Sequence, residues 1–384
     1  MNELGMRDRR SNIALITFEL TERCNFNCIH CCVRQDDCAK LRKSELRYDE
    51  INDIVDQAAD MGCLYIRFTG GEPLFRHDFA LIYEHARRKG MRVNIATNGA
   101  LINSRIAKMF ASFASFEDIY LSIYGLDNAA YEKTTRTAGS YRRVYDAMAL
   151  LRAFNVPYKL KGIFPNRTAK ELISYKRIIR TNKYLKDHIS GYNLYLDPRY
   201  RRDSPEKNAK IMSYRTKVES VFDNNNILID DYAKHCMTFI MGHAGRCGPN
   251  IFTCSAGRGQ ICVDSYGYLY PCLMLKSEGL SYDIRRGRLY TAISEFFPRK
   301  LNLISRNAEY IEKCSECFLK PFCEQCPGKS FVESGVYDQP LDYYCHVTNE
   351  IAQRIGLLKH SEQSWQISDW HARIRKYQME GRVL

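Results

Sequence analysis

Six strand-like segments, each followed by a segment of helical periodicity, occupy the first 222 residues of the chain. The strand-like segments are short apolar or β-branched runs at Ile13–Leu20, Leu64–Thr69, Arg92–Thr97, Asp118–Tyr124, Tyr158–Phe164 and Tyr192–Leu196. The helical segments that follow them are 48–61, 78–89, 103–114, 140–154, 171–183 and 206–222. Repeated strand–helix units predict an α/β fold with a parallel sheet and right-handed crossovers, and such a sheet curls towards a barrel. Six units are too few to close the eight-stranded form.

Polar residues mark the starts of several of these helices. Asn103 and Ser140 are predicted N-caps, since their side-chain oxygens accept free backbone N–H groups. Asp78 precedes another apolar helical run.

The composition narrows the class of protein. The chain has 384 residues, 45% of them hydrophobic, which is enough for a large core and two domains. We expect no membrane span, since no apolar run approaches the required length, and no secretory signal, since the first residues lack an apolar region. Sixteen cysteines without such a signal predict a reducing, cytoplasmic location and thiolates that bind metal.

The net charge of +13 suits an anionic substrate or an acidic peptide, and an ordinary basic surface would explain it equally well. Lys and Arg are spread along the chain, so we expect no specific nucleic-acid partner.

Three cysteines follow the first strand in a C-x3-C-x2-C pattern, Cys24, Cys28 and Cys31. Three thiolates hold three irons of a cubane cluster and leave the fourth iron open for a ligand. The alternative is a structural zinc site, which needs four N or S ligands and would recruit His30 or Cys32. A second motif, Gly70-Gly71-Glu72-Pro73, follows the second strand, at the barrel edge where active sites lie, and favours the cluster.

These two motifs at this separation resemble the radical S-adenosylmethionine (SAM) family, and the resemblance extends from about Ile13 to Cys345. It implies an open, partial (β/α)6 barrel. It also implies that SAM chelates the open iron through its amino and carboxylate groups. Reductive cleavage then yields a 5′-deoxyadenosyl radical that abstracts a substrate hydrogen, with the cofactor supplying the difficult chemistry.

The same resemblance implies which residues bind SAM. The backbone of the Gly70–Pro73 motif and the Glu72 carboxylate would hold the SAM amino group. Thr97 and Asn98 end the third strand near the ribose hydroxyls, while Ser122 and Arg136 would lie near the SAM carboxylate. Ordinary strand-end hydrogen bonding is the alternative for Asn98 and Ser122. Cys32 stands where the family usually has an aromatic residue, and we expect it to be buried as a small thiol.

A second cysteine system occupies the C-terminal third and closely resembles the SPASM extension, which holds two auxiliary [4Fe–4S] clusters. By the family pattern, the ligands of the outer cluster would be Cys314, Cys317, Cys323 and Cys345. Those of the inner cluster would be Cys254, Cys272, Cys326 and Cys247, with Cys262 as the alternative to Cys247. Substrate could also take that fourth position. The chain would then carry SAM and three [4Fe–4S] clusters. Two zinc ribbons are the alternative, because C-x2-C is also a zinc spacing.

These segments predict five regions. They are an N-terminal tail at 1–12, the partial barrel at 13–222, a linker at 223–245, a small SPASM domain with a β-hairpin and helices at 246–346, and a helical tail at 347–384. The hairpin would turn at Gly267.

Auxiliary clusters indicate that an electron is removed after hydrogen abstraction, so the predicted reaction is a two-electron oxidation. We expect crosslinking or oxidation of a ribosomally made peptide, with a flavodoxin or ferredoxin as reductant. The alternatives are dehydrogenation of a small-molecule alcohol, such as a sugar or aminocyclitol, and a zinc- or cluster-binding protein that is no enzyme. Leu273 stands where some relatives have a proton-accepting aspartate, so Asp197, at the end of the sixth strand, is the candidate base.

Overall fold

The computed structural model describes residues 13–33, 44–113, 119–163, 189–193, 248–320 and 325–379, together with Ser174, Ile178, Ala209, Met212, Ser213 and Cys323. The chain forms two compact units. The first comprises Met1–Asn166, Ser174–Arg215 and Ser255–Lys300, and the second comprises Arg167–Ile173, Thr216–Cys254 and Leu301–Leu384. In the described part of the chain, no helix has the length and apolar character needed to cross a bilayer.

A parallel sheet forms the centre of the first unit. Its first six strands are β1 (Leu15–Thr21), β2 (Tyr65–Gly70), β3 (Arg92–Thr97), β4 (Ile119–Ile123), β5 (Tyr158–Ile163) and β6 (Ile189–Asn193). They pair in chain order, each parallel to the next. The predicted α/β class with a parallel sheet is therefore confirmed. The sixth strand lies three residues earlier than predicted, and the segments predicted as helices at 171–183 and 206–222 fall almost wholly outside the described residues.

Three further strands extend the sheet on the other side of β1. They are β7 (Gln260–Val263), β8 (Tyr268–Tyr270) and β9 (Tyr282–Asp283). β7 runs parallel to β1 and antiparallel to β8, so the predicted hairpin exists, and it continues the sheet of the first unit. Gly267 adopts a φ of 89°, and the Asp264 carboxylate accepts the N–H groups of Tyr266 and Tyr268 across the turn.

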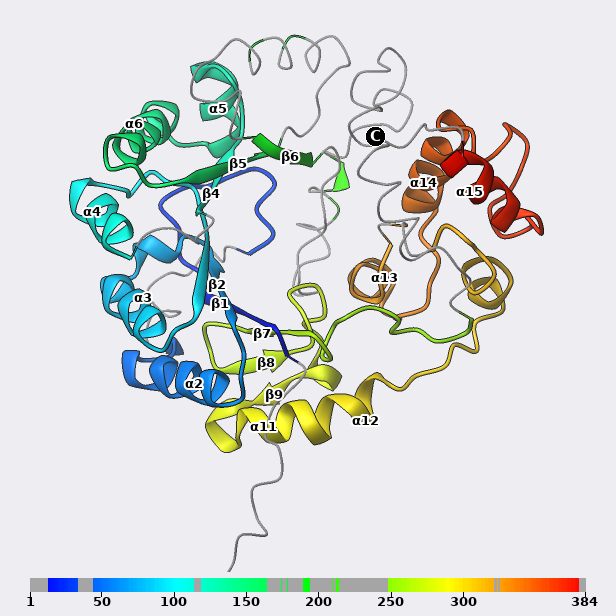
Figure 1. Ribbon diagram of the computed structural model, residues 1–384, viewed down its shortest axis with the longest axis horizontal. Coiled ribbons are helices and arrows are strands. Elements are labelled where there is room, and N and C mark those ends of the chain that lie inside the picture. The colour runs from blue at the N-terminus through cyan, green and yellow to red at the C-terminus, as the bar shows by residue number, and fades with distance from the viewer. Residues whose placement is uncertain are drawn as a thin grey trace, which may run out of the picture. The chain divides into compact units, whose positions relative to one another are not determined.

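Helices cover one face of the parallel strands (Figure 1). They are α2 (Tyr48–Asp60), α3 (Phe79–Arg88), α4 (Ser104–Ser112), α5 (Asn128–Thr135) and α6 (Ser140–Ala153), with a short turn, η1, at Pro73–Phe75. Side chains on β2 alternate, as expected of a strand. Ile66 and Phe68 are fully buried, and the Phe68 ring lies 6.2 Å from that of Phe79 on α3. Arg67, between them, therefore leaves the sheet on the opposite face.

The residues that begin the helices can be compared with the predicted N-caps. Asn103 accepts the N–H of Ile106 at 3.0 Å, which confirms it as an N-cap. Ser140 as an N-cap was wrong: Gly139, with a φ of 70°, holds that position, and the Ser140 hydroxyl bonds that of Thr135 at 2.7 Å. We did not predict α5, because its sequence lacks a clear apolar stripe.

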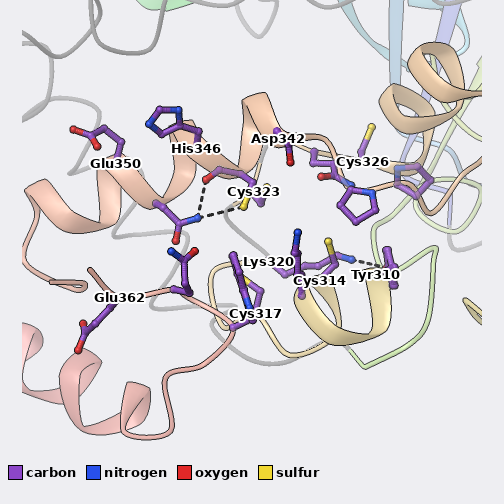
Figure 2. A pocket seen from close by; sticks show the side chains of 18 of the residues that line it. Tyr310, Cys314, Cys317, Lys320, Cys323, Cys326, Asp342, His346, Glu350 and Glu362 are labelled. Atoms are coloured by element: carbon purple, nitrogen blue, oxygen red, sulfur yellow. Dashed lines mark hydrogen bonds between the residues drawn. The ribbon is translucent and has the colours of Figure 1, made fainter. Parts of the chain in front are cut away.

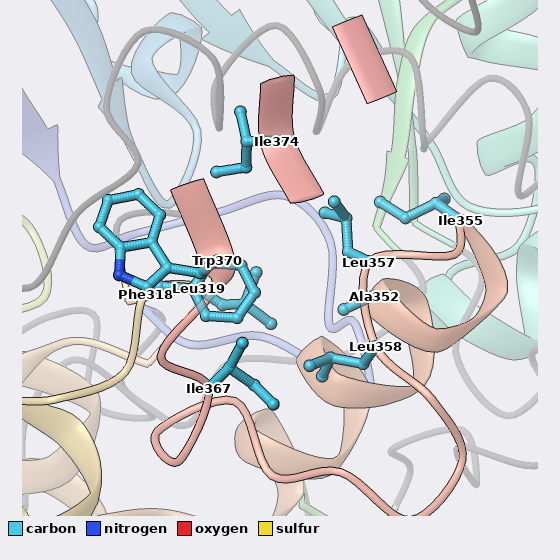
Figure 3. Packing of buried hydrophobic residues seen from close by; sticks show 9 residues of the cluster. All are labelled: Phe318, Leu319, Ala352, Ile355, Leu357, Leu358, Ile367, Trp370 and Ile374. Atoms are coloured by element: carbon cyan, nitrogen blue, oxygen red, sulfur yellow. The ribbon is translucent and has the colours of Figure 1, made fainter. Parts of the chain in front are cut away.

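The second unit contains η5 (Tyr310–Cys314), α13 (Pro327–Ser334), α14 (Asp342–Arg354) and α15 (Trp370–Met379). Its core gathers around Phe318 and Trp370, whose rings stack at 5.9 Å (Figure 3). The rest of this core is Leu319, Ala352, Ile355, Leu357, Leu358, Ile367 and Ile374. The predicted C-terminal helices are present, and α14 runs through the domain boundary that we placed at 346.

Between the hairpin and the second unit the chain forms short helical turns. They are η2 (Glu278–Leu280), η3 (Ile284–Arg286), α11 (Leu289–Thr291), η4 (Ala292–Phe296) and α12 (Phe297–Leu301).

We expect Arg76 to be a main contributor to the stability of the first unit. Its buried guanidinium pairs with Asp78 at 2.7 Å and donates to the carbonyls of Leu20 and Leu46. Replacement of Arg76 by Met leaves these acceptors unpaired and should lower the unfolding free energy by about 3 kcal/mol in urea denaturation. The exposed pair of Arg88 with Glu84 is the control. Arg88→Met should cost less than about 0.5 kcal/mol, and equal losses would contradict the prediction.

Candidate functional site

The three N-terminal cysteines lie on the loop that leaves β1, and all are partly exposed. The last turn of α5 holds this loop. The N–H groups of Asn27 and Ile29 donate to the carbonyls of Thr135 and Thr134, at 3.0 and 2.9 Å. A helix end leaves such carbonyls without partners inside the helix, so the unpredicted α5 supplies ready acceptors for the cysteine loop.

The cysteine thiols affect one another. Burial raises the pKa of the Cys28 thiol, and the nearby Cys31 and Cys24 raise it further through like-charge repulsion. In the described residues, no group of three or more His, Cys, Asp or Glu side chains is arranged to hold a single metal ion as it stands. The donor set of three adjacent thiols fits an iron–sulfur cluster, whose irons offset the repulsion between thiolates.

A buried ionic network fixes the start of this loop. Glu45 accepts from the Thr21 hydroxyl and from the Arg23 guanidinium, the latter at 2.9 Å. Tyr266, from the hairpin turn, donates to the Glu22 carboxylate at 2.8 Å. Sequence analysis missed this network, because its members are far apart in the chain and form no motif.

The Gly70–Gly71 pair is packed against the backbone that leads into Cys24. A Cβ at Gly70 would stand 2.2 Å from the Thr21 carbonyl oxygen, and one at Gly71 would stand 2.3 Å from that of Arg23. The N–H groups of Gly71 and Glu72 donate to these two carbonyls, at 2.7 and 2.9 Å. Any side chain would separate the two loops, which explains why this position of the chain needs glycine.

Glu72 is fully buried and bonded within the protein. Its carboxylate accepts from the Thr97 hydroxyl at 2.7 Å, the Asn98 N–H at 2.7 Å and the Leu74 N–H at 3.1 Å. A carboxylate offers about four acceptor positions, so one remains for an ammonium. Burial raises the pKa of Glu72 to about 7, although these three donors act to lower it. Glu72 thus ties the motif to the end of β3, a role that we did not predict.

The other predicted cofactor residues lie at strand ends of the same unit. Asn98 reaches the cysteine loop, because its amide donates to Asn25 at 2.8 Å and lies 3.6 Å from the Cys24 sulfur. Ser122 is partly exposed on β4. Arg136 is exposed in a left-handed conformation at the end of α5, with a φ of 48°. A different arginine, Arg143, lies over the ring of Phe26 in the cysteine loop, 5.7 Å from its centroid.

Cys32 and His30, which neighbour the predicted cluster cysteines in the chain, differ in solvent exposure. Cys32, which we expected to be buried, is partly exposed. His30 is buried with its ring 5.0 Å from that of Tyr124, and burial lowers its pKa to about 4. A neutral imidazole packed on an aromatic ring indicates a packing role for His30.

The second unit contains a cavity of about 440 Å³ lined by five cysteines (Figure 2). They come from η5, α14 and the chain between them, and they are Cys314, Cys317, Cys323, Cys326 and Cys345. Lys313, Lys320, Asp342 and His346 also line the cavity. Sequence analysis predicted four of these cysteines as one ligand set, and the structure brings all four to one cavity.

Burial and neighbouring thiols raise the pKa of cysteines in this cavity. Burial raises the pKa of Cys345 to about 12, and the charges of Cys323 and Cys314 act in the same direction. Burial likewise raises the pKa of Cys317 to about 12, with Cys323 and Cys345 adding to it. Cys326 differs, because after burial the thiol that raises its pKa is Cys254. Cys326 therefore differs from Cys317 and Cys345 in the thiol that raises its pKa, and the division into an outer and an inner ligand set stays a prediction.

Two further ligand candidates, Cys272 and Cys262, belong to the first unit. Cys272 is partly exposed in the first unit. Cys262 is fully buried on β7, where burial raises its pKa, and it behaves as a core side chain. Cys247 and Asp197 lie outside the described residues.

The chain resembles proteins of a known family. Residues 18–173 match the radical SAM superfamily. The chain carries a radical SAM domain. The chain is 26% identical to the AdoMet-dependent heme synthase of Methanosarcina barkeri, over 84% of this chain and 93% of that protein. It is 25% identical to the mycofactocin maturase MftC of Mycobacterium tuberculosis, over 67% of this chain and 63% of that protein.

Solved structures share the fold of the radical SAM chain. The AdoMet-bound structure of anSMEcpe aligns with a TM-score of 0.66 at 17% identity, over 94% of this chain and 98% of that one. Streptococcus suis SuiB bound to S-adenosylmethionine aligns with a TM-score of 0.61 at 15% identity, over 87% of this chain and 77% of that one. The predicted radical SAM domain is thus confirmed, and the relatives of the chain include maturases of the SPASM type.

Titration of Glu72 should be visible in the pH dependence of stability. Its pKa is raised in the folded chain from 4.5 to about 7, so the folded state holds the proton more tightly than the unfolded state. The unfolding free energy should therefore fall by about 2 kcal/mol between pH 5.5 and 8, as the proton is lost. Glu72→Gln should remove this fall when anaerobic, SAM-free protein is unfolded in urea. An equal fall in the variant would assign it to another group.

Iron content should separate the two auxiliary ligand sets. If Cys314 and Cys345 serve one cluster, the double variant Cys314→Ala/Cys345→Ala should lose about four of about twelve irons per chain. The variant Cys345→Ala/Cys326→Ala should lose about eight, because it damages two clusters. Cys63→Ala is the control, since this buried thiol donates to the carbonyls of Ala14 and Tyr65. Equal losses in the two double variants would show that the sets are assigned wrongly.

Proposed function

We propose that the protein reductively cleaves SAM at a [4Fe–4S] cluster held by Cys24, Cys28 and Cys31, and that it oxidises its substrate with the help of two auxiliary clusters. When bound, the cluster and SAM supply a 5′-deoxyadenosyl radical. The observation that carries the proposal is the close packing of the Gly70–Glu72 motif on the residues that lead into Cys24. This packing supports the proposal because it brings the carboxylate proposed to bind the SAM ammonium next to the loop proposed to bind iron.

The five-cysteine cavity supports the auxiliary clusters. Mutual repulsion among Cys314, Cys317, Cys323 and Cys345 makes four thiolates at this place unfavourable unless cations offset them. Cys254, Cys272 and Cys326 remain the proposed ligands of the inner cluster, with Cys247 as the fourth. Each fully ligated cluster takes four thiolates, so this assignment is complete without Cys262.

We propose a peptide as the substrate. The support comes from relatives: MftC is named a maturase, another relative is named PqqA peptide cyclase, and SuiB has been solved with its precursor peptide. The net charge of +13 suits an acidic peptide. Asp197 remains the proposed base, and a flavodoxin or ferredoxin the proposed reductant.

A heme precursor is the second candidate substrate. The observation in its favour is the likeness to the heme synthase of Methanosarcina barkeri, which covers 93% of that protein. A 32% identical stretch of the Fe-coproporphyrin III synthase from the same organism points the same way.

Release of 5′-deoxyadenosine tests the proposal. Anaerobically reconstituted, reduced protein should release it from SAM, as followed by liquid chromatography and mass spectrometry. The triple variant Cys24→Ala/Cys28→Ala/Cys31→Ala should release none and should lose about four irons per chain. Cys63→Ala is the matched control and should keep both iron and activity. A triple variant that still cleaves SAM would end the proposal.

The substrate class has its own test. Iron-coproporphyrin III and candidate precursor peptides encoded near this gene would be supplied separately to the reduced protein. A mass change of a peptide, with consumption of SAM, supports the peptide. Conversion of iron-coproporphyrin III alone would show instead that the substrate is a heme precursor.

A further inference from the structure

Two cations project from the sheet face opposite the helices. Arg67 on β2 alternates with the buried Ile66 and Phe68, and its Nε donates to Asn94 on β3 at 3.0 Å. Lys161 on β5 is exposed and follows the buried Leu160. The register pairs Lys161 with Ser122 of β4, so both side chains lie on this same face.

The Tyr120 ring contacts Lys161 and also a third cation, Lys159. The Nζ of Lys161 lies 4.8 Å from the centroid of the Tyr120 ring, and that of Lys159 lies 5.7 Å from it. Cations favour the electron-rich face of a tyrosine ring. The ring thus keeps these ammonium groups on the same face of the sheet from which Arg67 projects.

Two acidic side chains of the described part of this unit, Glu19 and Glu72, are already bonded within the protein. Glu19, on β1, is fully buried in an ion pair with Lys276, whose side chain is 2% exposed. Glu72 is bonded to three donors of the protein. Across the described residues, neither Arg67 nor Lys161 forms an ion pair with a carboxylate.

The shift in the pKa of Lys161 agrees with the lack of an ion-paired carboxylate among the described residues. The pKa of Lys161 is lowered, first because the surrounding protein displaces part of the water around its ammonium although the side chain keeps access to solvent, and then by the positive charge of Arg67. A carboxylate near Lys161 would oppose that shift. The two cations therefore repel each other, and an anion placed between them would relieve the repulsion.

We propose that Arg67 and Lys161 bind a carboxylate group of the substrate. A guanidinium matches a carboxylate with two parallel hydrogen bonds, while an ammonium adds a point charge. This assignment rests on the proposed function and specifies that its substrate carries a carboxylate. Both an acidic peptide and a heme precursor with carboxylate side chains would present the group.

For Arg67, position along the strand favours the substrate over the carboxylate of SAM. The proposed contacts to the SAM amino group and ribose stand at the carboxyl ends of β2 and β3, at Gly70–Glu72 and Thr97–Asn98. Arg67 precedes Gly70 by three residues, which puts it roughly 10 Å from that end along the strand. A substrate held there by its carboxylate would direct its other end towards the radical. Lys161 pairs with Ser122, a residue proposed to lie near the SAM carboxylate, so its role is decided by the SAM affinity of its variant.

The test uses two small probes and the reconstituted, full-length protein. The acidic probe is the tripeptide Ac-Glu-Glu-Glu-NH2, and the neutral probe is Ac-Gln-Gln-Gln-NH2. Isothermal titration calorimetry measures the affinity for each probe and for SAM. The variants are Arg67→Gln and Lys161→Gln. The matched control is Arg92→Gln, since Arg92 lies on the same face at the start of β3, where it bonds the Tyr65 hydroxyl.

We expect the wild-type protein to bind the acidic probe more tightly than the neutral one. Arg67→Gln and Lys161→Gln should each weaken the acidic probe about tenfold and leave the affinity for SAM unchanged. Arg92→Gln should change the affinity for either probe less than twofold.

Three outcomes would overturn the inference. They are equal affinity for the two probes, an Arg92→Gln effect as large as that of Arg67→Gln, and a loss of SAM affinity in Lys161→Gln. The last would assign the site to the carboxylate of SAM. Probe binding needs no turnover, so a protein that binds the acidic probe but fails to cleave SAM would refute the proposed function alone.

Discussion

The contact between the Gly70–Glu72 loop and the chain from Thr21 to Arg23 is the constraint on which the first unit depends. Two backbones approach so closely that a Cβ on either glycine would collide with a carbonyl oxygen. Two N–H···O bonds hold the loops together, and the Glu72 carboxylate extends the same connection to β3. The ends of β1, β2 and β3 are thereby fixed relative to one another before any cofactor binds. This is the pre-organisation that a cofactor site requires.

Ionisable groups inside the protein are arranged in two ways. Around the start of the cysteine loop, Arg23, Arg76, Glu45 and Asp78 neutralise one another in a connected network. Breaking such a network leaves buried charges unpaired, which is why it is rigid. The cysteines of the second unit and the pair Arg67–Lys161 are the opposite case. The thiols stay protonated because ionisation would bring like charges together, and the two cations repel each other, so a bound partner of opposite charge would stabilise each group.

Local sequence signals were sufficient for much of the fold. β3 and the start of α2 fall where predicted, because alternation of apolar residues and helical periodicity are read over a few residues. The cap at Asn103 was predicted correctly for the same reason, but Ser140 was not. Its neighbour Gly139 adopts the left-handed conformation, and Thr135 takes the serine hydroxyl. Helix α5 was missed because it is held mainly by its contacts, through carbonyls that serve the cysteine loop.

The amino-acid sequence by itself determined the chemistry of the site: the cysteine spacing, the glycine pair and the order of the strands are all local patterns. Only the tertiary structure decided how those patterns combine. It joined β7 to β1, set Glu72 on Thr97 and Asn98, gathered five cysteines at one cavity, and turned Arg67 and Lys161 to one face of the sheet. The physical reason is that hydrogen-bond partners and repelling charges come from segments far apart in the chain. Their proximity exists only once the sheet and the C-terminal core have packed.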